Sequence, residues 1–259
     1  MSSDLLWRYE VTVRLGFTEY LAANPPLIVA TTTLPRAVLQ CLFFTLLGST
    51  TSASGEQFAF VGSVAVIITL STLVGVCDVP MLEKWSGTFY RLQNAPLRPG
   101  TIFLLRTFPW LVEAVLGVLL CIAVVGPVTG QASTSWALLG QLPIYLLMTV
   151  TSALAGLTAA ALAVGRRADV LVGNAFAYLV MVAGGALIPV GQLRWLDAVG
   201  RVLPIRNGLL AVRDRLAGRS GTGHLLAEVL VGAVWGCLAF AAYSIQTRRA
   251  RREGIDDYA

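Results

Sequence analysis

Long apolar runs separated by short polar segments dominate the hydrophobic pattern of this chain. The runs approach or exceed the roughly 20 residues that cross a bilayer core about 30 Å thick. They predict transmembrane helices over residues 27–48, 58–77, 102–125, 136–164, 170–187 and 224–245. The sequence therefore predicts an all-α, polytopic membrane protein with six transmembrane helices in one domain, residues 1–259.

Residues 4–21 follow a different pattern. Leu5, Tyr9, Val13 and Phe17 recur four residues apart, while charged residues fill the other faces. This spacing is typical of an amphipathic helix that is too polar to span a membrane. We expect it to lie along the membrane surface until the following Asn-Pro-Pro sequence ends it.

A second amphipathic stretch, residues 79–98, follows the second predicted span. Leu82, Trp85 and Phe89 line one face at helical spacing, and Pro96 lies near the end of the segment. The pattern predicts a short helix within a charged loop.

Residues 189–222 combine apolar residues with several arginines before the last span. We expect short helices embedded in the outer membrane interface, where arginine side chains could face lipid phosphates.

Composition and charge support membrane insertion and set an orientation. Hydrophobic residues make up 56% of the chain and charged residues only 13%, against about 25% charged in a typical soluble domain. The net charge is +5, but most arginines flank apolar runs, so they indicate topology and not nucleic-acid binding. The loops at 49–57 and 126–135 contain no Lys or Arg, which predicts that both termini are cytoplasmic.

Candidate chemistry within the apolar runs is sparse. Glu113 lies inside the third predicted span, where a carboxylate is costly and is a candidate for the substrate path or for gating. The alternative is a protonated or partnered structural acid. His224 is the only histidine, and the four cysteines have no paired spacing, so we predict no metal site.

A membrane-embedded enzyme and an ion-coupled carrier are two other functional classes for a chain of this kind. A membrane-embedded enzyme would need a catalytic signature such as G-x-S-x-G, which does not occur in the sequence. An ion-coupled carrier would need charged residues within several spans and an internal repeat. Only Glu113 is clearly located within a predicted span, and the sequence shows no repeat. The sequence also contains no G-x-x-x-x-G-K-[ST] phosphate-binding loop.

The order of these segments resembles that of the membrane subunits of type 2 ABC exporters, in particular daunorubicin-exporter permeases. Two stretches carry the resemblance. One is EKWSGTFYRLQNAPLRPG, residues 83–100, which is similar to the family's E-(x)n-GT-(x)n-PL-x-P signature. The other, residues 184–213, is similar to the end of the family's fifth helix and its two re-entrant helices, with matches at Gly185, Pro189 and Pro204.

The resemblance implies a coupling helix that docks on a cytoplasmic ATPase subunit. The residues expected at this contact are Glu83, Trp85, Gly87, Thr88, Phe89 and Arg91. ATP and Mg would then be bound by the partner, and no cofactor by this chain.

The resemblance also implies pairing with a second copy or a sister permease, and export as the transport direction. A largely apolar interior favours a hydrophobic drug, natural product or lipid-like substrate. The arginine-rich and alanine-rich composition is typical of GC-rich bacteria, so we expect the bacterial plasma membrane, with membrane lipids in contact.

Overall fold

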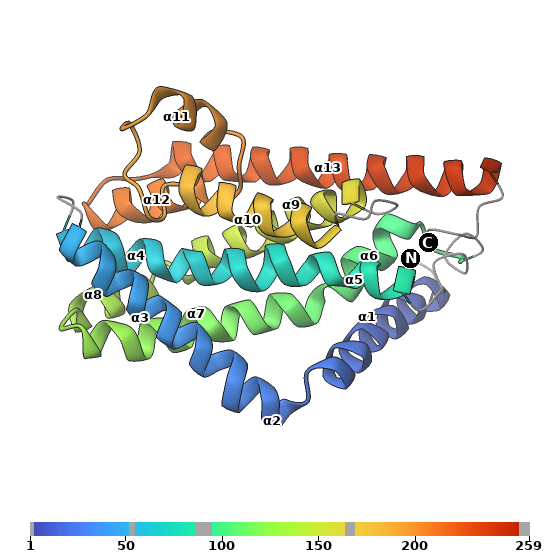
Figure 1. The fold of residues 1–259 in the computed structure, drawn as a ribbon, viewed down its shortest axis with the longest axis horizontal. Coiled ribbons are helices and arrows are strands. Elements are labelled where there is room, and N and C mark those ends of the chain that lie inside the picture. The colour runs from blue at the N-terminus through green and yellow to red at the C-terminus, as the bar shows by residue number, and fades with distance from the viewer. Residues whose placement is uncertain (1–2, 52–54, 86–94, 164–168, 254–259) are drawn as a thin grey trace.

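The computed structural model describes residues 3–51, 55–85, 95–163 and 169–253, and these residues are helices and connections without a strand. The helices run mostly lengthwise in an elongated bundle, and both termini lie at the same end (Figure 1). Five helical segments have the length and apolar composition needed to cross a membrane: Pro26–Thr50, Gly55–Glu83, Pro99–Val128, Leu142–Ala163 and Thr222–Arg248.

The first helix, α1 (Ser3–Ala23), covers the predicted amphipathic segment and diverges from the bundle (Figure 1). After the Asn-Pro-Pro break, α2 (Pro26–Ile28), the π-helical η1 (Val29–Thr33) and α3 (Leu34–Thr51) form one continuous rod. The backbone N–H of Leu34 bonds to the carbonyl of Val29. This wider turn directly precedes Pro35, which lacks an N–H, and such local adjustment lets a membrane helix tolerate proline.

The second span consists of α4 (Gly55–Ile68), the π-helical η2 (Thr69–Val74) and α5 (Gly75–Trp85). Its helix runs past the predicted end at residue 77 and includes Pro80. The first part of the predicted loop, residues 79–85, is therefore a continuation of the span. The hydrophobic spacing of Leu82 and Trp85 indicated a helix correctly but did not show where that helix began.

Two predicted spans are interrupted in the structure. The third consists of α6 (Pro99–Arg106) and α7 (Phe108–Val128), which meet at Thr107, two residues before Pro109. The fourth was expected to be continuous from residue 136, and this was wrong. It is divided into α8 (Ala132–Leu139) and α9 (Leu142–Ala163), because the Gly140–Gln141 connection turns the chain before Pro143.

The fifth predicted span, residues 170–187, is represented by α10 (Asp169–Ala183), with an apolar stretch from Leu171 to Ala183. Two short helices follow, α11 (Arg194–Gly200) and α12 (Arg206–Leu216), with Pro204 between them. The 32-residue α13 (Thr222–Glu253) completes the fold and extends to the end where the termini lie (Figure 1).

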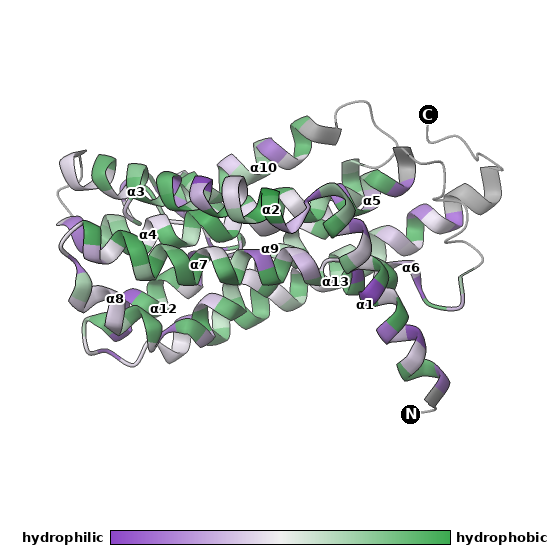
Figure 2. Cartoon of the chain, turned by 90° about the horizontal axis from the view of Figure 1, so that it is seen from below, coloured by the Kyte–Doolittle hydropathy of each residue, from purple (hydrophilic) through white to green (hydrophobic). Residues whose placement is uncertain are grey.

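Close helix packing depends on small residues at specific contacts. A Cβ added at Gly156 of α9 would lie 2.8 Å from the carbonyl oxygen of Leu73, and one added at Gly62 of α4 would lie 1.9 Å from that of Ala186. Gly156 therefore lets α9 approach η2 closely. Hydrophobic residues cover α4, α7 and α9 along most of their length (Figure 2).

Candidate functional site

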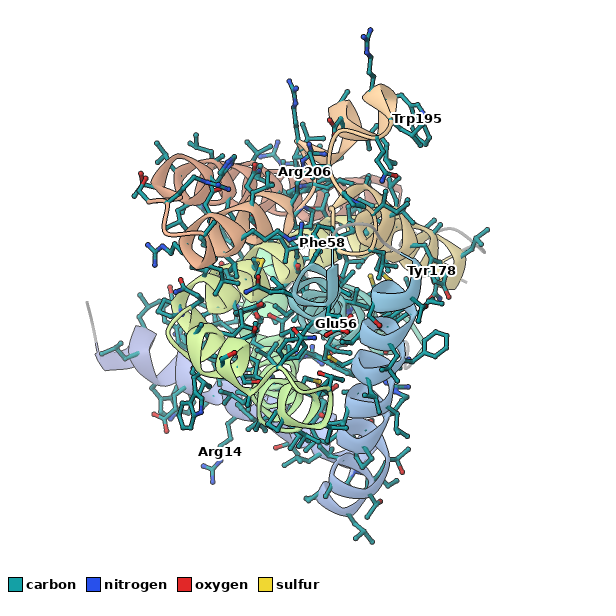
Figure 3. All side chains as sticks on the ribbon, turned by 90° about the vertical axis from the view of Figure 1, so that its left-hand side faces the viewer. Arg14, Glu56, Phe58, Tyr178, Trp195 and Arg206 are labelled. Atoms are coloured by element: carbon teal, nitrogen blue, oxygen red, sulfur yellow. The ribbon has the colours of Figure 1, made fainter. Side chains whose placement is uncertain are left out.

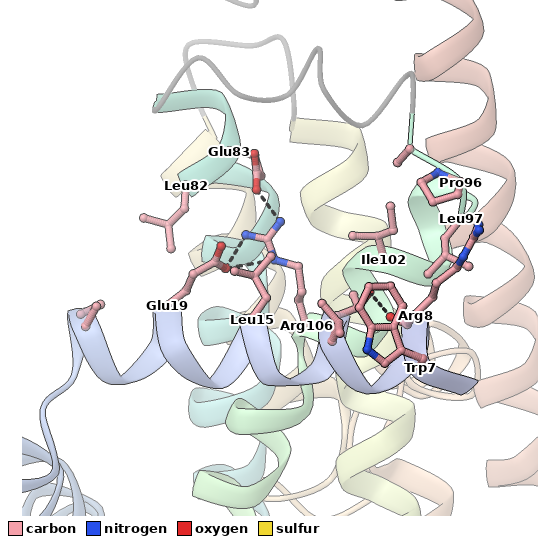
Figure 4. Close-up of a pocket in the computed structure, with 15 residues that line it drawn as sticks. Trp7, Arg8, Leu15, Glu19, Leu82, Glu83, Pro96, Leu97, Ile102 and Arg106 are labelled. Atoms are coloured by element: carbon pink, nitrogen blue, oxygen red, sulfur yellow. Dashed lines mark hydrogen bonds and ion pairs between the residues drawn. The ribbon is translucent and has the colours of Figure 1, made fainter. Parts of the chain in front are cut away.

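An arginine joins three helical elements at the end of the bundle that contains α1. Arg106, the last residue of α6, has only 3% of its side chain exposed. Its Nε donates a hydrogen bond to Oε2 of Glu19 in α1 at 3.0 Å, and its Nη2 contacts the same oxygen. Its Nη1 donates to Oε1 of Glu83 in α5 (Figure 4). We call Arg106, Glu19 and Glu83 the Arg106 cluster.

The backbone of α1 approaches the same point closely. A Cβ added at Gly16 would lie 2.8 Å from the Cα of Arg106, so a glycine is needed where the two elements touch. The contact places Glu19, three residues further along α1, within reach of the guanidinium. Direct backbone packing and ionic bonds therefore fix α1 to the joint between α6 and α7.

A second polar contact ties α1 to α7. The Tyr20 hydroxyl donates to Oε2 of Glu113 at 2.5 Å, and the Tyr20 ring meets Trp110 edge-on with centroids 4.9 Å apart. Burial raises the pKa of Tyr20, and the hydrogen bond to Glu113 and the charge of that residue raise it further. Glu113 is 6% exposed, so it is a partnered acid at a helix contact. Its role in a substrate path or gating stays a prediction.

A largely apolar groove with a volume of about 840 Å³ runs beside the Arg106 cluster. Its walls come from α1, the end of α5, residues 95–97 and α6, and include Trp7, Leu15, Leu82, Pro96 and Ile102 (Figure 4). Trp7 is 61% exposed. An amphipathic helix thus leaves part of its apolar face uncovered next to a compact ionic centre.

One residue predicted to contact an ATPase, Glu83, lines the groove. Glu83 belongs to the Arg106 cluster, and Trp85 is the last residue of α5. Gly87, Thr88, Phe89 and Arg91 lie outside the described residues. The structure therefore joins one predicted coupling residue to α1 and α6, and leaves the others as predictions.

The opposite end of the bundle contains a buried acid that sequence reasoning missed. Glu228 of α13 is 0% exposed. Its carboxylate accepts hydrogen bonds from the backbone N–H groups of Ile205 at 2.9 Å and Gly208 at 3.0 Å, and from the Thr151 hydroxyl at 2.6 Å. The expectation that only Glu113 is clearly placed within a span was wrong. Glu228 interrupts an apolar run in the sequence, and that signal was available.

Glu228 serves as an N-terminal cap for α12, supplied by another helix. The first N–H groups of a helix have no partner within it, and its positive dipole end favours a carboxylate. Ile205, which precedes α12, has φ of 67°, a left-handed conformation that is unusual for a β-branched residue. The cap stabilises the turn that begins α12.

The predicted residues of the outer segment lie around this cap. Gly185 has φ of 76° and directs the chain away from α10 towards the half-buried Pro189. Its carbonyl accepts a hydrogen bond from Nη1 of Arg213 in α12 at 2.9 Å. Pro204 is buried directly before Ile205. Two short helices, α11 and α12, lie on either side of this proline, and their placement in the outer membrane interface stays a prediction.

An ion pair joins α11 to the start of α12. Nη2 of Arg206 lies 2.8 Å from Oδ1 of Asp197. The Arg206 guanidinium lowers the pKa of Asp197 below its usual value. Trp195, on the same short helix, stands away from the bundle (Figure 3).

Groups of three or more metal-binding side chains do not occur in the described ranges.

The comparisons with known proteins agree with this architecture. A family model described as ABC-2 type transporter matches residues 20–216, which is most of the chain. A search of curated proteins found no match. The family match covers every described element from the end of α1 to the end of α12. The chain therefore belongs to the ABC-2 type transporter family, as a multi-pass membrane component that works with an ATP-binding subunit.

Proposed function

We propose that this chain is the transmembrane subunit of an exporter, similar to daunorubicin-exporter permeases, that moves a hydrophobic drug, natural product or lipid-like molecule. A separate cytoplasmic ATPase subunit would bind ATP and Mg, and this chain would bind no cofactor. The Arg106 cluster carries the proposal. It ties Glu83, which opens the predicted ATPase-docking segment, to α1 and to the α6–α7 span.

The proposed coupling follows from these contacts. Closure of the ATPase would move the segment that follows Trp85. Because Arg106 bonds to both Glu83 and Glu19, a displacement of α5 would pull on α6 and α1 together. The Tyr20–Glu113 bond adds a second attachment between α1 and α7. A motion at the ATPase would then tilt the spans instead of bending one loop.

We propose six spans, with both termini in the cytoplasm of a bacterium whose plasma membrane holds the chain. Support comes from the five long apolar helices and the shorter apolar helix Leu171–Ala183. Six crossings return the chain to its starting side, and the termini lie at the same end (Figure 1). Arg8, Arg14, Arg98 and Arg248 belong to elements at that end, as the positive-inside rule requires of a cytoplasmic face.

Pairing with a second copy or a sister permease is part of the proposal. Large apolar side chains on α3 are exposed, among them Leu39 at 64% and Phe43 at 59%. In a membrane such a face is covered by lipid or by another permease. We assign part of it to the partner permease and the remainder to lipid.

An ion-coupled carrier is the second candidate, because Glu113 and Glu228 are both buried acids within the spanning helices. Their partners weigh against it. Glu113 accepts a bond that attaches α1, and Glu228 caps α12. Both acids therefore already stabilise helix contacts.

The test is a tagged chain purified from its native host in mild detergent, followed by reconstitution in liposomes. We expect a soluble-type ATPase to co-purify and to support ATP-dependent movement of daunorubicin. Replacing Gly87 and Phe89 by charged residues should remove the ATPase. Arg106→Gln should retain the ATPase and ATP hydrolysis but lose most of the transport.

Arg14→Gln is the matched control, because Arg14 is an exposed arginine of α1 that points away from the bundle (Figure 3). It should leave transport unchanged. A chain that purifies alone and transports independently of ATP would refute the exporter proposal and favour the carrier.

A further inference from the structure

At the end of the bundle opposite α1, a half-buried arginine has no counter-charge among the described residues. Among the arginines near α12, Arg206 pairs with Asp197, and Arg219 pairs with Asp214. Arg213 is half-buried and forms no ion pair within the described part of the chain. Among the described residues, its guanidinium contacts the neutral carbonyl oxygen of Gly185 and the ring of Phe58.

The unused atoms of Arg213 lie on one edge of its guanidinium. Nη1 donates to Gly185, while Nε and Nη2 are buried and have no hydrogen-bond partner among the described residues. Nε and Nη2 form the parallel pair of donors that matches the two oxygens of a carboxylate or phosphate. Both donors of this edge are therefore enclosed and unsatisfied among the described residues.

The surroundings hold this edge in place. The Phe58 ring lies against the guanidinium, with the Arg213 Cζ 3.7 Å from the ring centroid. Stacking on one face and a bond at Nη1 fix the plane, so the free edge is oriented before any ligand arrives. Figure 3 looks onto this end of the bundle and shows Phe58 near its centre.

Leaving two charged donors unsatisfied away from water is costly. Burial lowers the pKa of Arg213 to about 10, which still leaves it charged at neutral pH. A cavity of about 160 Å³ adjoins the side chain and is lined by Gln57, Phe58, Val61, Leu216 and Ala217. Polar and apolar atoms share its walls about equally; Gln57 contributes an exposed amide, and Val61 and Leu216 contribute apolar surface.

We propose that Arg213 forms a binding site for an oxyanion, a carboxylate or phosphate group, carried on an apolar body. The oxyanion would accept two hydrogen bonds from Nε and Nη2, and the apolar body would lie along Val61 and Leu216. Rotation of the Gln57 side chain would open the cavity to it. The site depends on this chain alone and not on the direction or energy source of transport.

The test uses the purified chain, with any co-purifying subunit, in phosphatidylcholine nanodiscs at pH 7. Dodecyl phosphate is the probe and dodecanol its uncharged control, with native mass spectrometry and thermal unfolding as readouts. Dodecyl phosphate should bind and raise Tm, and dodecanol should do neither. Arg213→Gln should weaken binding at least about tenfold, because a charge-assisted pair of bonds is lost.

Two further variants separate recognition from folding. Arg213→Lys keeps the charge but lacks the fork, so its affinity should fall between those of wild type and Arg213→Gln. Arg215→Gln, two residues away and exposed, should bind like wild type. Without probe, Arg213→Gln should change Tm little, because the lost contacts with Gly185 and Phe58 are offset by the removal of two unsatisfied buried donors. Equal binding by wild type and Arg213→Gln, or equal losses in Arg213→Gln and Arg215→Gln, would overturn the proposal.

Competition identifies the source of the oxyanion. Displacement of dodecyl phosphate by phosphatidic acid in the nanodisc, but not by millimolar inorganic phosphate, would assign the site to lipid-like headgroups. Displacement by inorganic phosphate as well would assign it to the phosphate group itself. Both results support an oxyanion site at Arg213.

Discussion

The two ends of the bundle handle buried charge in opposite ways. At the α1 end, Arg106 is enclosed by two carboxylates from different helices. At the other end, Glu228 is satisfied by neutral donors of a helix start, while Arg213 keeps two donors without a partner. The first arrangement is closed and self-sufficient, whereas the second leaves a cation unmatched.

We interpret the α1 end as a structural attachment between helices and the opposite end as a ligand-binding site. Ion pairs between helices hold elements in a fixed relation, which suits an end that must transmit force. A buried cation without a counter-charge costs free energy in the unliganded protein. An anionic ligand could supply the missing counter-charge. The following changes test whether the contrast between the ends is real.

The largest effect is expected for Arg106→Gln. It would leave Glu83, with 12% of its side chain exposed, buried without its counter-charge. Breaking a buried ion pair from one side costs about 3–5 kcal/mol, so the free energy of unfolding should fall by that order. Thermal unfolding in detergent, followed by tryptophan fluorescence, measures it. Arg8→Gln breaks only the exposed pair with Asp4 and should change stability by less than about 1 kcal/mol.

Glu228→Leu should have the next largest effect. It would leave the N–H groups of Ile205 and Gly208 without their carboxylate acceptor, at about 1–3 kcal/mol. The Thr151 hydroxyl would still bond to the carbonyl of Met148. Hydrogen exchange at residues 205–210 should accelerate at the same time. Glu228→Gln keeps one acceptor and should lose less. Exchange in Glu228→Leu as slow as in wild type would show that α12 needs no cap.

Tyr20→Phe should cost about 1.5 kcal/mol, because it removes one hydrogen bond to a carboxylate and retains the ring contact with Trp110. The measurement is again thermal unfolding. Tyr178→Phe is the matched control, since Tyr178 is 64% exposed and directed away from the bundle (Figure 3). Equal stability of the two variants would mean that the Tyr20–Glu113 contact does not hold α1.

Asp197→Asn should give the smallest effect, and the size of that effect depends on pH. The pKa of Asp197 is lowered by Arg206, so its contribution to stability is present above the ordinary aspartate pKa of about 3.9. It is lost as pH falls through the lower folded-state value. Wild type should therefore exceed Asp197→Asn in Tm at pH 7, and the difference should shrink below about pH 4. A difference that grows on acidification would contradict the ion pair.

Local pattern was sufficient to predict the helical segments. Hydropathy located the long apolar helices, and the four-residue spacing of Leu5, Tyr9 and Val13 located α1. Helix ends were less predictable. The hydrophobic pattern did not mark the break at Gly140–Gln141 or the continuation of α5 to Trp85, because both stretches stay largely apolar or amphipathic across these points.

The site could be predicted only in part for the same reason. Glu83 was recognised from a motif, but its bond to Arg106 spans 23 residues, and the bond from Arg106 to Glu19 spans 87. Nothing local to Arg213 distinguishes it from Arg215 or Arg219. Its difference arises from Phe58 and Gly185, which tertiary packing places beside it.

The length of α13 has a mechanical consequence. At 1.5 Å per residue, its 32 residues extend about 48 Å, while the hydrocarbon core is about 30 Å thick. On the proposed topology, this helix would therefore emerge from the membrane beside the start of α6. A tilt of a few degrees within the bilayer would be enlarged at its free end. On this topology, α13 would transmit movement of the spans to the subunit bound at the cytoplasmic face.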